Sequence, residues 1–334
     1  MERTSRAVVI TAAGVAELAE VTVAAPGPGE VTVRAEFSGV STGTDRWTAQ
    51  GRFDWGTARF PLVPGYQKVG VVVDAGVGAE DWIGRAVFAA SAHDFGDAAA
   101  QSGGHAEYSN HPLEHVYALR QAQGSEQGRG SFDPRLSLGI SIQVGYNAAH
   151  RIQPARVRRV AVIGDGIIGL SAALTAIGLG YQVAVVGRHE DRLAIATGAG
   201  AIAIDSSSAV EDVKAFTPEA IIDTIQTDAS FVIVINALPR DYGQVVYSGF
   251  TPGMPDAWAS MTILQQHSIT AHFQSGWTRE RLARVLESIE NDETGFSRIP
   301  VAQLGVDQAG AFFTDLIGGE RIPPASVINW RSER

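Results

Sequence analysis

The run Gly164-Asp165-Gly166-Ile167-Ile168-Gly169 has the composition and spacing to bind a pyrophosphate. It follows the β-branched segment 160–163 and opens the apolar segment 167–180. In a strand–turn–helix context, the first glycine allows a tight turn, the second lets the backbone approach phosphates, and the third lets helix and strand pack closely. Backbone N–H groups at the helix N-terminus would then bind the phosphates. The run predicts a dinucleotide site whose contacts are Gly164, Gly166, Ile167, Ile168 and Gly169.

The residues after the next predicted strand, Gln182–Val186, indicate which dinucleotide is preferred. NAD sites usually carry Asp or Glu at this point, where the carboxylate binds the ribose 2′-hydroxyl. This chain has Gly187-Arg188-His189 instead. A guanidinium can pair with a 2′-phosphate, so Arg188 favours NADP(H) over NAD(H), although it could simply stack on the adenine of either cofactor. Gly187 and Arg192 complete the expected cofactor-binding residues.

The composition argues against several kinds of site and partner. The 334 residues carry a formal net charge of −10 and no cysteine, which excludes disulfides, thiolate catalysis and thiolate metal ligands. Because long basic runs are lacking, no nucleic-acid partner is expected. Apolar stretches are too short to cross a membrane, and residues 1–10 lack the core of a signal peptide, so we expect a cytoplasmic protein.

Two patterns of hydrophobicity indicate the strands and helices that must position these residues. Residues 7–125 contain short segments of alternating apolar and polar residues, such as Val31–Phe37, and they predict an all-β module. Residues 157–275 alternate strands and helices, beginning with the strand Arg159–Ile163, and they predict an α/β fold with a doubly wound parallel sheet. A final strand is predicted over 325–330.

Three segments need separate interpretation. Phe231–Ile235 has the propensity of a buried strand, but a parallel sheet needs a crossover between the flanking strands, so we predict a helix over 228–238. Residues 133–151 are predicted to form one helix that joins two domains. Residues 121–131 are low in apolar content and predict a surface loop.

Four stretches of the chain resemble the medium-chain dehydrogenase/reductase superfamily. They are Gly39–Asp45, Pro61–Gly70, Gly103–Tyr108 and the glycine run, in the order and spacing typical of that superfamily. The resemblance implies a GroES-like β-rich catalytic domain over 1–135, completed by 295–334, a Rossmann domain over 136–294, and a homodimer. The first 80 residues are most similar to the bacteriochlorophyllide a dehydrogenase branch.

The chain departs from the zinc-dependent members of that superfamily. Those members carry Cys in the segment equivalent to Ser41–Asp45, Gly-His-Glu where this chain has Gly65-Tyr66-Gln67, and a third ligand near Gly139 or Ile140. A catalytic zinc normally needs three protein ligands. The resemblance therefore implies an enzyme without zinc or any other metal.

Without a metal, hydrogen-bond donors must stabilise the charge that develops on a carbonyl oxygen. The resemblance places Thr44 at the position of a proton-relay hydroxyl and Tyr66 at that of a metal ligand. We therefore expect Tyr66 to be the general acid and Thr44 a substrate hydrogen-bond donor, with Asp45 and Thr42 completing the catalytic set. Alternatively, Tyr66 could only fill the cavity, the threonines could only form a turn, and Asp45 could pair with Arg46 or a backbone N–H.

Aromatic residues lie near these motifs in the sequence, and they suggest a pocket that suits a flat or bulky apolar substrate. The expected substrate-binding residues are Trp47, Trp55, Gln67 and His93, and the other aromatic candidates are Phe53, Phe60 and Phe95. Ordinary core packing is the competing interpretation.

Three functions fit these expectations. The first is NADP(H)-dependent interconversion of a ketone and a secondary alcohol, acting on a small-molecule substrate. The second is reduction of an activated C=C bond, as in enoyl and quinone reductases. The third is NADPH binding without catalysis, which predicts a tight complex and no turnover.

Overall fold

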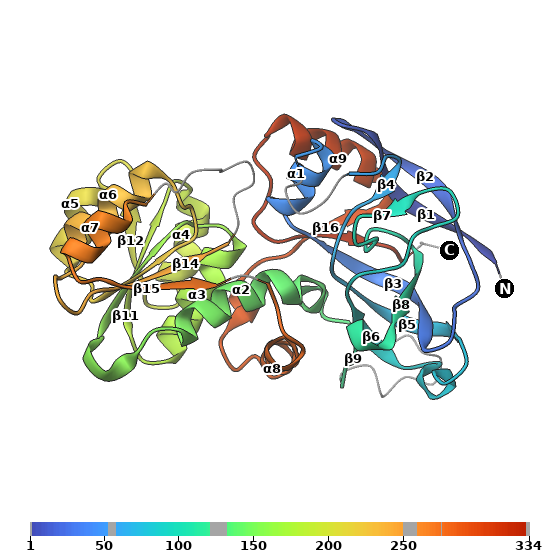
Figure 1. Cartoon of the computed structure of the whole chain (residues 1–334), viewed down its shortest axis with the longest axis horizontal. Coiled ribbons are helices and arrows are strands. Elements are labelled where there is room, and N and C mark those ends of the chain that lie inside the picture. The colour runs from blue at the N-terminus through green and yellow to red at the C-terminus, as the bar shows by residue number, and fades with distance from the viewer. Residues whose placement is uncertain (1, 53–57, 121–131, 250–258, 275, 332–334) are drawn as a thin grey trace. The chain divides into compact units, whose positions relative to one another are not determined.

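The chain folds into two compact units (Figure 1). The computed structural model describes residues 2–52, 58–120, 132–249, 259–274 and 276–331. Unit 1 comprises Met1–Gly139 and Pro300–Arg334, and unit 2 comprises Ile140–Ile299. The expected surface loop over 121–131 lies outside the described residues.

Unit 1 consists mainly of β-strands. One sheet has the order β2-β1-β4-β7, and a second has the order β16-β17-β3-β5-β6-β9, with β8 also paired to β3. The strands are β1 (Arg3–Ala12), β2 (Val15–Val23), β3 (Glu30–Val40), β4 (Leu62–Val63), β5 (Lys68–Ala75), β6 (Ala86–Ala89), β7 (Ala99–Ala100), β8 (Tyr108–Pro112), β9 (Val116–Ala118), β16 (Ala302–Gly305) and β17 (Ser326–Asn329).

The C-terminal segment completes the N-terminal sheet of unit 1. β17 runs antiparallel to β3 and pairs Ser326 with Val40, so the predicted final strand is confirmed. Helix α9 packs Phe312, Phe313 and Leu316 into the same core as Val40 and Ile328. The helices of this unit are α1 (Thr44–Ala49), α9 (Ala309–Gly318), and the 3-10 helices η1 (Glu80–Trp82), η2 (Leu113–His115), η3 (Pro134–Leu138) and η6 (Val306–Gln308).

Unit 2 is built on a parallel sheet with the order β12-β11-β10-β13-β14-β15. Renumbered along the chain, this order is 3-2-1-4-5-6, so the predicted doubly wound sheet is confirmed. The strands are β10 (Arg159–Ile163), β11 (Gln182–Gly187), β12 (Ile202–Asp205), β13 (Ala220–Asp223), β14 (Gln244–Ser248) and β15 (Thr270–Gln274).

Helices cover this sheet (Figure 1). They are α2 (Gly139–His150), α3 (Ile167–Gly178), α4 (Glu190–Thr197), α5 (Ala209–Phe216), α6 (Asp228–Ala237), α7 (Met261–Gln266), α8 (Arg279–Asn291), and the 3-10 helices η4 (Pro154–Arg156) and η5 (Phe296–Arg298). Val213, Val234 and Leu264, from α5, α6 and α7, share one core with sheet residues such as Ile221.

The segment Phe231–Ile235 is helical, as predicted against its β propensity. Thr227 Oγ1 caps α6 by accepting a hydrogen bond from Ser230 N, and Ser230 Oγ accepts one from Thr227 N. Phe231 and Val234 then bury their side chains against the sheet. The capping box and this burial fix the crossover between β13 and β14.

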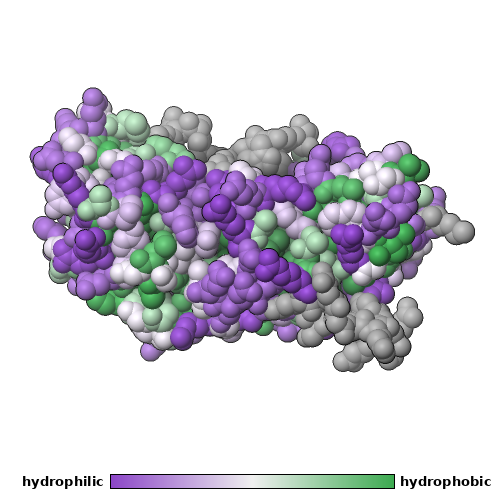
Figure 2. All heavy atoms as spheres, turned by 90° about the horizontal axis from the view of Figure 1, so that it is seen from below, coloured by the Kyte–Doolittle hydropathy of each residue, from purple (hydrophilic) through white to green (hydrophobic). Residues whose placement is uncertain are grey.

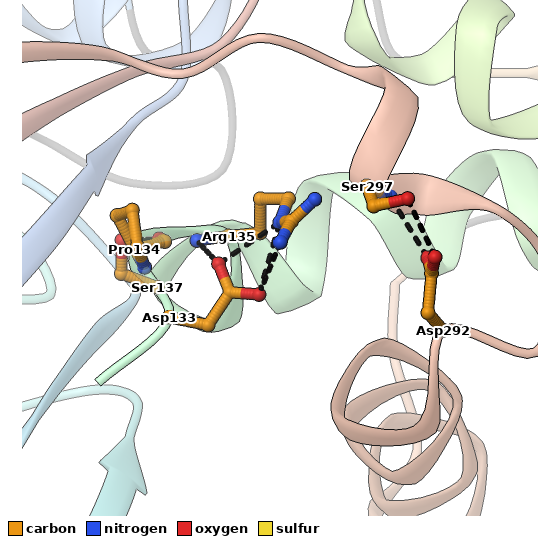
Figure 3. A network of polar contacts seen from close by, with 6 residues as sticks. All are labelled: Asp133, Pro134, Arg135, Ser137, Asp292 and Ser297. Atoms are coloured by element: carbon orange, nitrogen blue, oxygen red, sulfur yellow. Dashed lines mark hydrogen bonds and ion pairs between the residues drawn. The ribbon is translucent and has the colours of Figure 1, made fainter. Parts of the chain in front are cut away.

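The single helix predicted over 133–151 is wrong in its first turn, because η3 is a 3-10 helix and α2 follows it. Asp133 Oδ1 accepts a hydrogen bond from Arg135 N at 2.9 Å, and its carboxylate pairs with the Arg135 guanidinium (Figure 3). Within unit 2, Asp292 accepts a hydrogen bond from Ser297 N at 2.9 Å, just beyond the end of α8 (Figure 3).

The surface is largely polar on the face drawn in Figure 2, where hydrophobic residues lie in small groups between hydrophilic ones. Among the residues with described positions, no helix combines the length and the apolar character that crossing a membrane requires.

Candidate active site

The glycine run of unit 2 forms a sharp turn between β10 and α3. Gly164 has a φ of +117°, and a Cβ added there would lie 2.2 Å from Thr224 Oγ1. A Cβ at Gly169 would lie 2.0 Å from Gly164 O, whereas a Cβ at Gly166 would meet no described atom within 4 Å. Gly166 precedes α3 and offers no side chain to cap its first N–H groups. The turn therefore fits a pyrophosphate.

A carboxylate from this turn reaches the end of β11. Asp165 Oδ2 accepts hydrogen bonds from Arg188 N at 2.8 Å, His189 N at 2.9 Å and His189 Nδ1 at 2.8 Å. Arg192 Nη1 lies 3.6 Å from Asp165 Oδ1. Burial opposes the charge of Asp165, but the hydrogen bonds from His189 and Arg188 hold its pKa below the usual range. A negative charge thus lies beside the residues expected to select the cofactor.

This carboxylate was not predicted, because NAD sites usually carry theirs directly after the second strand. The signal was present in the glycine run, where Asp165 stands between the first two glycines. The Arg188 side chain itself is exposed, and Gly187 is buried beneath Asp165.

In unit 1, Asp45 closes the turn that carries the expected catalytic hydroxyls. Its Oδ2 accepts a hydrogen bond from Ser41 N at 2.7 Å, and Thr44 N lies 3.4 Å from Ser41 Oγ. Asp45 is buried, while Thr42 and Thr44 are half-buried at the start of α1. Asp45 was expected, as an alternative to a catalytic role, to pair with Arg46 or with a backbone N–H. The hydrogen bond from Ser41 N agrees with the second of these structural roles.

A buried chain of side chains continues from Asp45. His105 Nε2 lies 3.1 Å from Asp45 Oδ2, His105 Nδ1 lies 2.8 Å from Ser38 Oγ, and Trp330 Nε1 donates to Ser38 Oγ at 2.8 Å. Because an indole can only donate, Ser38 is free to direct its own proton to His105 Nδ1. The Nε2–H of His105 then donates to Asp45. This arrangement holds His105 as the Nε2–H tautomer.

Tyr66 lies next to this chain of side chains. A Cβ added at the preceding residue, Gly65, would lie 2.5 Å from His105 Cδ2, so the backbone at 65 packs directly on the imidazole. Tyr66 is half-buried. The structure therefore places the backbone before Tyr66 and the carboxylate of Asp45 beside His105, which was not among the predicted site residues. His105 could have been identified from the sequence, because it lies in the Gly103–Tyr108 stretch that carries the family resemblance.

The expected substrate-binding residues are placed in different parts of unit 1. Trp47 covers Gly43 beside the 42–44 turn, and Gln67 is fully buried, with its Nε2 3.5 Å from Gly39 O. His93 Nδ1 lies 2.8 Å from Glu30 Oε1, at the first residue of β3, whereas the 42–44 turn follows its last residue. At about 3.3 Å per residue, His93 is roughly 30 Å along the strand from that turn.

Two of the expected aromatic residues, Phe60 and Phe95, line one cavity of about 320 Å³, whereas Trp47 is not among its lining residues. Phe95 is buried in a core with Val9 and Val63, and Phe60 packs against a different core with Leu62. This placement follows the ordinary core-packing interpretation. Phe53 and Trp55 lie outside the described residues.

The donor set does not fit a catalytic zinc. The sequence has no cysteine, and over the described ranges no three His, Asp or Glu side chains come close enough to hold a metal ion. Both ring nitrogens of His105 are engaged, by Ser38 and Asp45. Zinc sites need three protein ligands, and the described residues do not bring three suitable side chains together.

A second buried polar cluster lies beside Gln67. Lys68 Nζ donates to Ala106 O at 2.8 Å and to Ser109 Oγ at 2.6 Å, and Ser109 Oγ lies 2.8 Å from His111 Nε2. Burial lowers the pKa of Lys68 from its usual 10.5 to about 7, although the charge of Glu107 works in the other direction. Burial, followed by the charge of Lys68, lowers the pKa of His111 to about 3. All three side chains are fully buried, so the cluster is structural.

Comparisons with known proteins agree with this architecture. Residues 27–121 match the family alcohol dehydrogenase GroES-like domain, and residues 159–237 match the 3-hydroxyacyl-CoA dehydrogenase NAD-binding domain. Alcohol dehydrogenase notN of Aspergillus sp. (strain MF297-2) is 27% identical over 199 residues. That match covers 53% of this chain and 55% of the Aspergillus protein, so it spans about half of the relative's length.

Two solved structures are similar over nearly the whole chain. A thermostable alcohol dehydrogenase from Pyrobaculum aerophilum is 22% identical, with a TM-score of 0.78, and the match covers 98% of this chain and 100% of that one. A putative zinc-binding dehydrogenase from Sinorhizobium meliloti 1021, bound to NADP, is 17% identical, with a TM-score of 0.80 and coverages of 98% and 99%. The predicted fold class, a Rossmann sheet with a GroES-like β-rich domain, is confirmed.

Proposed function

We propose that this chain is an NADP(H)-dependent oxidoreductase of the medium-chain dehydrogenase/reductase superfamily, and its matches to the alcohol dehydrogenase GroES-like domain and to an NAD-binding domain support this. In our proposal it interconverts a ketone and a secondary alcohol without zinc. The observation that carries this proposal is the Gly164–Gly169 turn, which presents uncapped N–H groups at the carboxyl end of a doubly wound sheet. Ligands of such sheets bind at this end, near the point where the strand order reverses.

The proposed preference for NADP(H) rests on the residues that follow β11. Arg188 is exposed there, no carboxylate follows the strand directly, and a guanidinium can pair with a 2′-phosphate. NAD(H) is the second candidate, because the carboxylate of Asp165 lies against Arg188 N and His189 N. A negative charge at this point repels a 2′-phosphate and can accept a hydrogen bond from a 2′-hydroxyl.

The residues of the glycine turn would hold the dinucleotide, which when bound would supply a hydride for the carbonyl carbon of a ketone. The side chains of unit 1 have the following roles in this proposal. The Tyr66 hydroxyl gives its proton to the carbonyl oxygen, and the Thr44 hydroxyl donates a hydrogen bond to that oxygen. Asp45, held by Ser41 N and His105, keeps the turn with Thr44 in place. In the direction of alcohol oxidation, the phenolate of Tyr66 takes the proton back.

Oxidation of NADPH tests this proposal with a panel of ketones and matched enones, before and after dialysis against a chelator. We expect turnover of ketones that the chelator does not change. Turnover of the enones alone would assign the chain to the C=C reductases, and tight NADPH binding without turnover would make it a binding protein. Activity that the chelator abolishes and Zn²⁺ restores would contradict the metal-free mechanism.

We further propose that two copies pair through β15. This strand ends the sheet order in the described part of unit 2, and its Phe273 side chain is 64% exposed. An edge strand presents unpaired backbone groups to a partner. Sedimentation velocity would give a dimer for the wild type and a monomer for Phe273→Pro, which removes a backbone donor at this edge. A wild-type monomer would contradict the pairing.

A further inference from the structure

The amide of Gln143 leaves one buried acceptor without a donor. Gln143 lies in the second turn of α2 and is fully buried. Its Nε2 donates to Gly276 O at 3.2 Å, whereas its Oε1 has no hydrogen-bond partner among the residues that the structure describes. Buried side-chain oxygens in folded proteins nearly always accept at least one hydrogen bond, so this oxygen indicates a ligand donor.

The polar groups around Gln143 are already paired with one another. Asn147 Nδ2 donates to Gln274 Oε1 at 2.5 Å, and Gln274 Nε2 donates to Val144 O at 2.8 Å and to Ser248 Oγ at 2.6 Å. These bonds tie α2 to the last residues of β14 and β15. None of these hydrogen bonds reaches Gln143 Oε1.

The helix that carries Gln143 packs beside the start of α3, which follows the glycine turn. A Cβ added at Gly145 would lie 2.2 Å from Ile168 O, so α2 packs directly against the first turn of α3. A Cβ added at Gly249, just after β14, would lie 3.9 Å from Ile168 Cδ1. Helix α2, the first turn of α3 and the residue after β14 therefore lie together within unit 2.

The strand order indicates which half of a bound dinucleotide would lie beside Gln143. The pyrophosphate binds at the turn after β10, and the adenosine half extends toward β11, where Arg188 follows the strand. The other half extends over β13, β14 and β15, because the strand order reverses at β10. Gln143 is tied to the residues that follow β15, on this second side.

We propose that Gln143 Oε1 accepts a hydrogen bond from the carboxamide NH₂ of the bound nicotinamide. This assignment rests on the proposed function, since it takes the ligand of the glycine turn to be a nicotinamide dinucleotide. The Nε2 bond to Gly276 O fixes the amide so that its oxygen, rather than its nitrogen, is offered to the ligand. Gln143 thus selects an amide over other groups at that ring position.

Three ligands isolate this hydrogen bond when their affinities are measured by calorimetry. They are the oxidised dinucleotide, its 3-acetylpyridine analogue, in which a methyl group replaces the NH₂, and the matching ADP-ribose, which lacks the pyridine ring. The 2′-phosphorylated or unphosphorylated series is used, whichever the wild type binds more tightly. We expect the wild type to prefer the carboxamide to the acetyl analogue by about tenfold, the size of one buried hydrogen bond.

Gln143→Met removes the acceptor at nearly constant volume. We expect this variant to bind the dinucleotide and the acetyl analogue equally, with an unchanged affinity for the ADP-ribose. Gln274→Met is the matched control, because it alters the same network without touching Gln143 Oε1, and it should retain the preference for the carboxamide.

The outcomes separate the two proposals. A wild type that binds none of the three ligands would overturn the proposed function, whatever Gln143 does. A wild type that binds the dinucleotide and its acetyl analogue equally would overturn the assignment of Gln143 alone, and this result needs no variant to fold. A Gln143→Met protein that still prefers the carboxamide would also overturn the assignment of Gln143.

Discussion

His105 Nε2 lies 3.1 Å from Asp45 Oδ2, and both side chains are buried. The pair joins two segments far apart in the sequence, and it fixes the turn that carries Thr44. Because Asp45 also accepts from Ser41 N, the carboxylate satisfies two buried donors at once.

Removal of this carboxylate should therefore destabilise unit 1. Asp45→Ala leaves Ser41 N and His105 Nε2–H without an acceptor, at a cost of about 2–4 kcal/mol in the free energy of unfolding. Urea denaturation measures the change. Asp307→Ala is the control, because the Asp307 side chain is 90% exposed, and its effect should be small. Equal stabilities of the Asp45 and Asp307 variants would contradict the role given to the pair.

Tyr66→Phe tests the general acid. Loss of the phenol should lower kcat for ketone reduction by roughly 10²–10⁴-fold, because proton transfer contributes that much, while the Kd for the dinucleotide stays unchanged. Steady-state kinetics and calorimetry give the two quantities. Tyr117→Phe removes a phenol elsewhere in unit 1 and should keep full activity. A fully active Tyr66→Phe enzyme would assign the ring to space filling only.

Arg188 and Asp165 should affect the choice of cofactor in opposite directions. Arg188→Ala removes the cation expected at the 2′-phosphate, so we expect the Kd for NADPH to rise about 10- to 100-fold with little change for NADH. Asp165→Asn removes a negative charge from the same place and should shift the preference toward NADPH. If Arg188→Ala raises the Kd for NADPH and for NADH equally, the Arg188 side chain stacks on adenine and does not distinguish the two cofactors.

Lys68 should make stability depend on pH. Its pKa is about 7 in the folded chain and 10.5 when exposed, so between these values the unfolded state binds more protons. The free energy of unfolding should therefore rise with pH across this window, by on the order of 4 kcal/mol from this group. Lys68→Met should abolish most of that rise in urea denaturation at several pH values.

Lys214→Met provides the comparison for Lys68, since Lys214 is exposed. This variant should keep the pH dependence of the wild type. A Lys68→Met protein with an unchanged dependence would show that Lys68 stays charged when buried.

The sequence predicted the parts of the fold that repeat or that topology requires. The strand Arg159–Ile163 forms as predicted, and the helix over 228–237 forms because a parallel sheet needs a crossover there. The first turn of the helix predicted from 133 was wrong, because Asp133 and Pro134 begin a 3-10 helix.

The candidate site was harder to predict, because its contacts join residues distant in the sequence. His105 meets Asp45 across 60 positions, and Asp165 reaches Arg188 across 23. Neither spacing follows a helix or strand period. His93 was grouped with the site through sequence proximity, but the structure places it at Glu30, at the far end of β3.

Calorimetric titration of NADPH into the wild type and Gly166→Val tests the account most directly. A valine at 166 has open space and a φ of −76°, so the variant should fold with near wild-type stability. Its side chain would occupy the place of the pyrophosphate. We predict micromolar or tighter binding to the wild type and at least about 100-fold weaker binding to Gly166→Val, as expected for loss of the helix N-terminal phosphate site. Equal binding to both proteins would contradict the account.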